Sequence, residues 1–337
     1  MNQGWKTSTF KWFVITGVVF TFCALAVIGK AWHDYMRPGP LIRDVEVVIP
    51  HGGYASTITC LQKEGILSSS WWTTSLFQIA IVLTRKDGRL HAAEFHFPAH
   101  SSMQHVLWIL RHGKPVEHKL TIPEGLTAYQ IKKILDNAPF LVGITPLPAE
   151  GSVLPQTYNY RRNSQRKDLL KRMQTDMTNT LHKTWEERDT QITLQNPKDL
   201  LILASLIEKE TALSTERPLV ARVFFNRLKK GMKLQTDPTV IYALTHGKTH
   251  LGRPLSHTDL QVQSPYNTYL NTGLPPGPIC TPSISSLQAA AHPAKSEALY
   301  FVADGAGGHH FSKTLEEHNH YVSLLREKEI SLKKTPQ

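Results

Sequence analysis

The order of apolar and polar positions predicts its clearest helix over residues 196–212, NPKDLLILASLIEKETA. Asn196 is a favourable N-cap residue, and Pro197 suits the first helical position. Asp199 suits the first turn, where the helix dipole favours an acid. Apolar residues then recur at three- and four-residue spacing. The start signal and the periodicity therefore agree on a helix with one apolar face.

One acid falls on that apolar face. At ~100° per residue, Glu210 lies in the middle of the side that carries Leu203, Leu206 and Ile207. Glu208 points roughly 160° away, because two residues make a little over half a turn. A carboxyl on an apolar face must be paired, protonated or used in chemistry. Glu210 is therefore the first candidate for a functional residue.

Short strands and helices alternate before this segment. The strand-like stretches are residues 45–50, 90–98 and 119–122, and the helix-like stretches are residues 54–64, 102–110 and 128–137. Residues 71–83 are mostly apolar and fit a helix or a buried strand. The alternation predicts a small α+β module over residues 45–122, followed by a connecting segment over 123–155.

The rest of the chain predicts a mixed α/β domain over residues 156–326. Its further helices are expected at residues 165–187, 216–230 with Thr215 as cap, and from Thr314 to near Leu325. A hairpin is expected from residues 299–303 and 309–311, with a glycine-rich turn over 304–308 between them. Residues 327–337 are expected to be a C-terminal tail.

The N-terminal pattern predicts a membrane anchor. Residues 12–29 (WFVITGVVFTFCALAVIG) form an uncharged run just long enough to cross a bilayer as a helix. Lys6 and Lys11 favour a cytoplasmic tail over residues 1–11, and residues 30–44 read as a linker. A cleaved signal peptide is the alternative, but its candidate site at residues 24–26 lies inside the run. An uncleaved single-pass anchor is the prediction, with the body of the chain on the far side.

Composition and charge narrow the partners. The chain has 337 residues, 41% hydrophobic and 19% charged, which supports packed domains over disorder. The net charge of +11 suits nucleic acid, an acidic membrane face or an acidic polymer, or reflects a basic surface without a partner. No nucleic-acid-binding signature accompanies it, so nucleic acid is not expected. Cys60 and Cys280 are expected to be free thiols, because nothing in their context indicates a pair.

Several kinds of site are disfavoured. The stretch 304–308 (DGAGG) lacks the Lys-Ser/Thr of a phosphate-binding loop, and no Gly-x-Ser-x-Gly elbow is present. Four histidines cluster near the C-terminus without a metal-binding framework, namely His309, His310, His318 and His320. Neither a metal nor another cofactor is expected.

Glycosidic chemistry fits the lone acid better. Glu208 and Glu210 diverge too far to act on one bond as a carboxylate pair. In an apolar wall the pKa of Glu210 should rise, which suits a general acid near neutral pH. The alternative is a buried acid that pairs with Arg217, Arg222 or Arg227. Solvent is the expected environment of the latter two arginines, and Asn226 beside them is a candidate ligand-binding residue.

Two polar-aromatic loops add candidate sugar-binding side chains. Sugar sites combine amide and hydroxyl groups with aromatic rings, and that mixture is supplied by Gln235, Thr236, Asp237, Tyr266, Asn267, Thr268 and Tyr269. Turn formation around the Asp-Pro step and burial of the tyrosines in the core are the alternative explanation.

Several long motifs in residues 203–319 resemble one protein family. They are LASLIEKETA, ERPLVARVFFNRLKKGMKLQTDPTVIYAL, YNTYLNTGLPPGPICTPS, LQAAAHPAK and LYFVADGAGGHHFSKTLEEHN. In these the chain resembles the YceG-like, or MltG, family of endolytic murein transglycosylases. Weaker similarity extends to TIPEGLTAYQI and EGSVLPQTYNY. The resemblance implies a LysM-like subdomain over residues 45–122 and a catalytic domain over 156–326.

The resemblance also implies a reaction. The family's essential acid falls on Glu210, the second acid of the Glu-Lys-Glu-Thr motif. The implied enzyme sits in the bacterial inner membrane with a periplasmic body. It cuts MurNAc–GlcNAc bonds in nascent peptidoglycan strands, leaves 1,6-anhydro-MurNAc ends and limits strand length. The implied substrate-binding residues are Asn226, Gln235, Thr236, Asp237, Tyr266, Asn267 and Tyr269.

One position departs from the family pattern. Gln156 stands where an acid usually follows the proline of the LPQTY segment, which leaves a charge role there in doubt. Peptidoglycan synthases are candidate partners. A non-catalytic peptidoglycan-binding scaffold that recruits such synthases is the alternative from another functional class.

Overall fold

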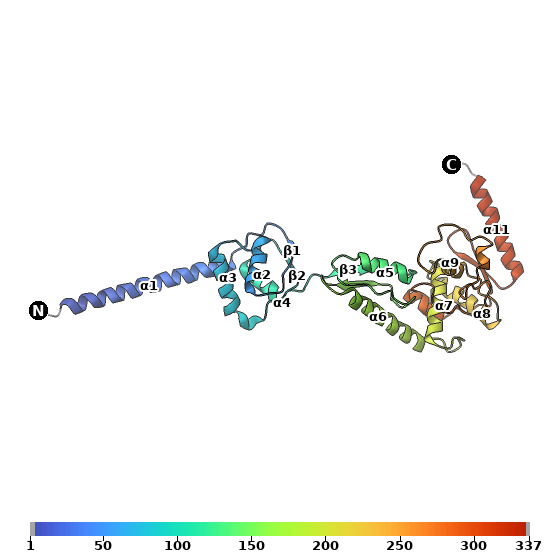
Figure 1. Cartoon of the computed structure of the whole chain (residues 1–337), viewed down its shortest axis with the longest axis horizontal. Coiled ribbons are helices and arrows are strands. Elements are labelled where there is room, and N and C mark those ends of the chain that lie inside the picture. Colours follow the sequence, from blue (N-terminus) through green and yellow to red (C-terminus); the bar gives the residue numbers. More distant parts are fainter. Residues whose placement is uncertain (1–3, 335–337) are drawn as a thin grey trace. The chain divides into compact units, whose positions relative to one another are not determined.

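The chain folds into a mixture of helices and short antiparallel strand pairs. The computed structural model describes residues 4–334; residues 1–3 and 335–337, the outermost parts of the two expected tails, lie outside it. The chain divides into two compact units, Met1–His118 and Lys119–Gln337 (Figure 1). The mixed helix-and-strand prediction is confirmed, and each unit is described by itself below.

The first unit begins with the long apolar helix α1, Gly4–Met36. Its part Trp12–Met36 is long and apolar enough to cross a membrane, and none of its apolar window is buried inside the protein. The apolar run expected over residues 12–29 is therefore helical. The helix continues to Met36 and so includes residues that the sequence suggested as linker.

The globular part of this unit packs three helices against a two-stranded sheet. Strand β1, Val45–Val48, pairs antiparallel with β2, Glu94–Phe97, so that Val47 lies opposite Phe95. The helices are α2, Tyr54–Lys63; α3, Trp71–Leu83; and α4, Met103–His112. Residues 71–83 are thus a helix, and a short 3-10 turn, Arg85–Asp87, follows it. The core contains Leu61, Ile66, Phe77, Phe95, Phe97 and Leu110.

The second unit opens with a small sheet flanked by two helices. Strand β3, His118–Thr121, lies beside β4, Thr157–Tyr160. Helix α5, Ala128–Asn137, carries the capping box of Thr127 and Gln130, and α6 covers Arg166–Glu186. Strand β4 was not predicted, because its TYNY sequence lacks the apolar alternation that marked the other strands.

Helix α7, Pro197–Glu210, lies at the centre of the second core. The Asn196 side chain accepts a 3.0 Å hydrogen bond from the amide of Asp199, as the capping signal predicts. Helices α8, Arg217–Lys229, and α10, Ile284–Ala291, pack against α7, and α9, Asp237–Thr245, contacts it as well. Helices α9 and α10 were not predicted.

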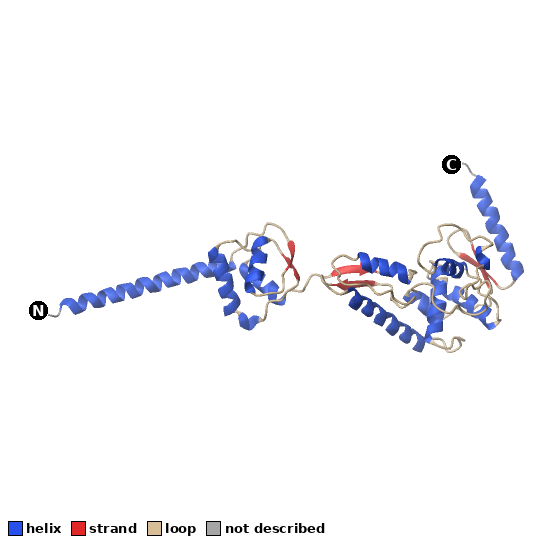
Figure 2. Ribbon diagram, in the orientation of Figure 1, coloured by secondary structure: helices blue, strands red, loops and turns tan. Residues whose placement is uncertain are grey.

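The predicted start of α8 and the predicted end of the final helix were wrong. Helix α8 starts after Glu216 rather than after Thr215, and the side chain of Glu216 makes no capping hydrogen bond. Hairpin strands β5, Tyr300–Ala303, and β6, His309–Ser312, pair as expected. The final helix α11, Leu315–Lys334, runs past Leu325 into the expected tail, because no glycine or proline ends it there. Loops and turns, coloured tan in Figure 2, make up most of residues 246–283 between α9 and α10.

Candidate active site

Glu210 is the last helical residue of α7. Thr211 adopts an extended backbone (φ −141°, ψ 133°), so the helix stops directly after the acid. The apolar residues Leu203, Leu206 and Ile207 are fully buried, as the periodicity predicts. The carbonyl groups at a helix C-terminus carry partial negative charge, which disfavours a carboxylate there. The position alone therefore favours the protonated acid.

The surroundings of Glu210 also favour its protonated form. Its Oε1 atom is buried and has no hydrogen-bond partner within residues 4–334. Burial is the largest influence and raises the pKa of Glu210 to about 7. The Thr236 hydroxyl acts to lower this pKa, whereas the charge of Asp237 raises it further. His309 and Arg227 also act to lower it. A carboxyl with this pKa is able both to give and to take a proton near neutral pH.

No arginine neutralises Glu210 by an ion pair in the described part of the chain. Arg217 bonds instead to Glu208, with 3.2 Å between Nη2 and Oε1. Arg222 donates to the carbonyl of Ala294. Arg227 donates to the carbonyl oxygens of Leu299 and Leu234. The expectation that Arg222 and Arg227 face solvent was wrong, because both hold neighbouring backbone segments in place.

Glu208 belongs to a separate structural cluster. Its Oε2 accepts hydrogen bonds from the amide (2.9 Å) and the hydroxyl (2.6 Å) of Ser283 at the start of α10. The side chains of Glu208 and Arg217 are each only 4% exposed. This cluster ties α7, α8 and α10 together. The two acids of the motif therefore have different surroundings, in agreement with their helical spacing.

Glu210 lines a cleft of about 410 Å³ in the second unit. The lining residues are Glu210, Arg227, Leu234, Gln235, Thr236, Asp237, Tyr269, Tyr300, Phe301, Leu315 and His318. Four of the seven proposed ligand-binding residues are among them, namely Gln235, Thr236, Asp237 and Tyr269. One wall is thus the loop that leads into α9.

This loop is held by the neighbouring polar segment. The amide of Gln235 donates to the Thr268 carbonyl (3.2 Å), and the amide of Thr236 donates to the Thr268 hydroxyl (3.0 Å). Gln235 has a left-handed backbone with φ +53°, which is uncommon outside glycine and is found at strained sites. Tyr269 donates a 2.6 Å hydrogen bond from its hydroxyl to Asp237 Oδ1. Thr268 is therefore a supporting residue.

A second part of the cleft lining was not predicted. The guanidinium carbon of Arg227 lies 5.2 Å from the centre of the Tyr300 ring, and His318 stacks on the same ring at 5.3 Å between centroids. Burial lowers the pKa of His318, and its buried Nδ1 has no hydrogen-bond partner in the described chain. In the sequence, the unusual aromatic and histidine content around residues 300–320 was the signal that could have indicated this part of the cleft.

Three proposed ligand-binding residues lie outside the cleft lining. Asn226 donates to the carbonyl oxygens of Ser296 and Ala298. Asn267 is fully buried and donates to the carbonyl oxygens of Leu260 and Val262. The Tyr266 ring packs against Tyr242, 4.9 Å between centroids. All three hold the fold around the cleft. Gln156 is not among the lining residues either, and donates to Asp176.

His309 provides a further polar link near Glu210. Its Nδ1 lies 2.7 Å from Glu216 Oε2, and its amide donates to Glu216 Oε1 at 2.9 Å. Burial acts to raise the pKa of Glu216, but the bonds from His309 outweigh it and leave that pKa lowered. The pair fixes strand β6 to the start of α8.

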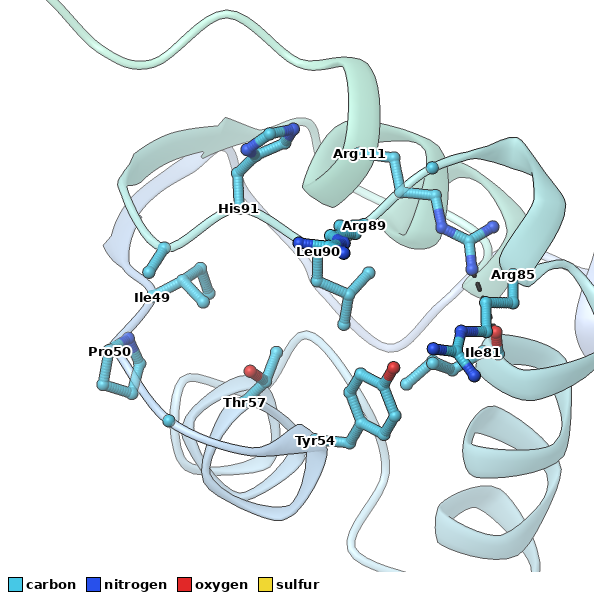
Figure 3. A pocket seen from close by; sticks show the side chains of 13 residues that line it. Ile49, Pro50, Tyr54, Thr57, Ile81, Arg85, Arg89, Leu90, His91 and Arg111 are labelled. Atoms are coloured by element: carbon cyan, nitrogen blue, oxygen red, sulfur yellow. Dashed lines mark hydrogen bonds between the residues drawn. The ribbon is translucent and has the colours of Figure 1, made fainter.

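The first unit carries a separate groove of about 270 Å³ (Figure 3). It lies between the start of α2, with Tyr54 and Thr57, and the segment that follows α3. Basic side chains line it, namely Arg85, Arg89, His91 and Arg111, and none of its lining residues within 4–334 is acidic. The guanidinium of Arg111 donates to Thr84 and to the Ile81 carbonyl. This groove was not predicted.

Comparison with known proteins places these features in a family. A sequence model of the YceG-like family matches residues 47–323. An endolytic murein transglycosylase of Bacillus subtilis is 46% identical over 186 residues, which cover 54% of this chain and 50% of the relative. One from Streptococcus pneumoniae is 29% identical over 369 aligned positions, which cover 93% of this chain and 65% of the relative. The chain thus spans half to two thirds of the length of these relatives.

A solved structure agrees with the sequence relatives. The crystal structure of a YceG-like protein from Listeria monocytogenes is 31% identical, with a TM-score of 0.53. The similarity covers 82% of this chain and 98% of that one. With the family match across both units, these comparisons show that the chain belongs to the YceG-like family.

Proposed function

We propose that the protein is a membrane-anchored endolytic peptidoglycan transglycosylase with Glu210 as its catalytic acid and base. The observation that carries this proposal is a buried carboxyl on the lining of a cleft, with a pKa of about 7 and an Oε1 atom that has no hydrogen-bond partner among the described residues. The names of the B. subtilis and S. pneumoniae relatives support the same activity.

The proposed reaction needs one acid and no separate nucleophile. Protonated Glu210 donates its proton to the oxygen between MurNAc C1 and GlcNAc C4, and the C1–O bond breaks through an oxocarbenium-like state. The Glu210 carboxylate then takes the proton from the MurNAc 6-hydroxyl, whose oxygen attacks C1. This closes the 1,6-anhydro ring and restores protonated Glu210.

The cleft offers groups suited to each stage. The charges of Arg227 and His309 favour the Glu210 carboxylate and so help to stabilise it after proton donation. The Gln235 amide and the Tyr269–Asp237 pair are placed to bind sugar hydroxyl groups. Tyr300 and His318, which stack on each other, add an aromatic surface to the cleft lining that suits contact with a sugar ring.

The proposed setting follows from the first unit. Helix α1 has the length and composition of a membrane span, which supports a single-pass anchor in the inner membrane with a periplasmic body. The β1-α2-α3-β2 order supports a LysM-like subdomain over residues 45–122, and the second unit supports a catalytic domain over 156–326. Nascent peptidoglycan strands are the proposed substrate, and cleavage would limit strand elongation.

Glu210→Gln tests the assignment, because it removes the transferable proton and keeps the volume. Both full-length proteins are incubated with polymerised murein, and 1,6-anhydro-MurNAc ends are measured by mass spectrometry. We expect the wild type to form them and the variant to lose activity by at least about a hundredfold. Equal product from both would remove Glu210 from the mechanism. Absence of product from both, with retained murein binding, would instead support a scaffold that recruits synthases.

A further inference from the structure

One face of helix α3 is apolar and exposed. The side chains of Trp71, Ile79, Val82 and Leu83 are 78%, 54%, 62% and 76% exposed. At 100° per residue they fall within an arc of about 120°. The opposite face is buried in the core through Thr73, Phe77, Ala80 and Ile81. An exposed apolar helix face of this kind indicates a binding surface.

Helix α3 is attached to the end of the apolar helix α1. The Trp72 indole donates a 2.9 Å hydrogen bond to Asp34 Oδ2, and the Lys30 ammonium lies 5.5 Å from the Trp72 ring centre. Lys30 and Asp34 also pair at 2.7 Å. Within this unit α3 begins beside the end of α1 and runs across its direction (Figure 2). The apolar face of α3 therefore starts beside Lys30 and Asp34, the first charged residues after the apolar run of α1.

Tryptophans gather at this junction. Trp32 on α1 is 64% exposed and packs near Tyr35, while Trp71 and Trp72 contact each other edge to face at 5.9 Å. Tryptophan is enriched at the boundary between acyl chains and headgroups, because its ring is apolar and its N–H is polar. The junction has the composition of that boundary.

Exposed basic residues follow α3 directly. They are Arg85, Lys86 and Arg89, and Figure 3 shows Arg85 and Arg89 beside the groove of this unit. The acid among them, Asp87, lies 3.8 Å from Arg111 and so faces a cation of its own unit. Basic residues near a membrane surface are attracted to anionic lipids.

We propose that α3 is an interfacial helix that rests on the anionic bilayer surface entered by α1. Its exposed apolar side chains insert among the acyl chains, while Arg85, Lys86 and Arg89 meet the headgroup phosphates. At 13 residues α3 is too short to span a bilayer, so it lies along the surface. The inference rests on the proposed anchoring by α1. It implies two attachments, which fix the orientation of the first unit on the membrane.

The test measures the depth of single fluorescent labels on the full-length chain in vesicles of phosphatidylethanolamine and phosphatidylglycerol. A nitrobenzoxadiazole label is placed at Ile79→Cys, in a chain that also carries Cys23→Ser and Cys60→Ser; Cys280 is fully buried. The same label at Glu46→Cys, on the exposed side of β1, is the aqueous control. Native Cys23, labelled in a Cys60→Ser chain, reports insertion of α1.

We expect acyl-chain nitroxides to quench the labels at Cys23 and Ile79→Cys at least about twofold and iodide to quench neither. The Glu46→Cys label should show the opposite pattern. Combined Arg85→Glu, Lys86→Glu and Arg89→Glu changes should reduce lipid quenching at position 79 toward its value in neutral phosphatidylcholine vesicles.

Three results would overturn the proposal and separate it from the anchoring itself. Iodide quenching at position 79 with lipid quenching at Cys23 leaves the anchor and removes the interfacial helix. Protection at position 79 from both quenchers means that a second copy or another protein covers α3. Absence of lipid quenching at Cys23 overturns the anchor and this inference together, whereas murein cleavage tests Glu210 independently.

Discussion

Tyr269 and Asp237 form a 2.6 Å hydrogen bond across the rim of the cleft that holds Glu210. Asp237 is the first residue of helix α9. Tyr269 follows Thr268, whose carbonyl accepts a hydrogen bond from the amide of the strained residue Gln235. The bond therefore joins the start of α9 to a loop that lies 32 residues later in the chain. The charge of Asp237 also contributes to the raised pKa of Glu210.

Removal of this bond should affect catalysis more than folding. In Tyr269→Phe, Asp237 loses its partner, and the fold should lose about 1 kcal/mol, because a single hydrogen bond is worth about that much. Transglycosylation should fall about tenfold in kcat/KM, since the loop beside Glu210 is released. The measurements are murein cleavage kinetics and denaturant unfolding.

Tyr266→Phe is the matched control. Tyr266 packs on Tyr242 outside the cleft lining, so loss of its hydroxyl should leave kcat/KM within about twofold of the wild type. Equal losses in the two variants would mean that the Tyr269 hydroxyl has no particular role in the site.

Activity should depend on pH through Glu210. Because burial raises its pKa to about 7, the proton-donating form is lost as pH rises through that value. The rate of anhydro-end formation should fall above about pH 7, by roughly tenfold per pH unit. A rate that stays level from about pH 6 to about pH 9 would contradict a general-acid role for this carboxyl.

The same shift predicts a change in stability. The folded-state pKa is raised from 4.5 to about 7, so the folded protein holds this proton more tightly than the unfolded chain. The associated stability is fully present below about pH 4.5 and is lost as pH rises through 7, with a limit of about 3 kcal/mol. Glu210→Gln should remove this dependence, which hydrogen exchange of the α7 amides would show.

Replacement of Glu208 should reduce the stability of the fold more than replacement of Glu210. It is buried against Arg217 and Ser283, so Glu208→Gln removes the buried counter-charge of the guanidinium and leaves only Glu124, which is 55% exposed and lies 3.5 Å away. We expect a loss of about 3 kcal/mol in unfolding free energy, whereas Glu210→Gln should cost less than about 1 kcal/mol near pH 7. Denaturant titration of both variants makes the comparison.

A double variant tests whether the unbalanced charge of Arg217 causes this loss of stability. Glu208→Leu combined with Arg217→Met removes both charges of the buried pair and should be more stable than Glu208→Gln alone. If Glu208→Gln instead folds with unchanged stability, the pair contributes nothing to the packing of α7 against α10.

The sequence could predict α7 because all its signals are local. The Asn196 cap, the apolar periodicity and the position of Glu210 depend on residues within one helix, and the structure agrees with each. The cleft is different. Arg227, Tyr300 and His318 come together only through the packing of α8, the hairpin and α11, and no local pattern records that approach.

Residue type also predicted the wrong role for two asparagines whose side-chain amides bond to the backbone. Asn226 and Asn267 look like sugar-binding amides, but both donate to backbone carbonyl oxygens. An amide that satisfies the backbone and one that faces a ligand have the same sequence signature. Only the three-dimensional surroundings separate Asn267 from Gln235, which lines the cleft.

Gln235 allows strain and function to be tested separately. Its φ of +53° is costly for a side chain with Cβ, so Gln235→Gly should stabilise the fold by up to about 1 kcal/mol. The same change removes an amide from the cleft and should reduce kcat/KM about tenfold. His246→Gly is the control, because His246 has a similar φ of +49° at the end of α9 and does not line the cleft. It should gain similar stability and keep full activity. If Gln235→Gly also kept full activity, the side chain at this position would be dispensable for substrate, and the left-handed backbone alone would explain its place beside Glu210.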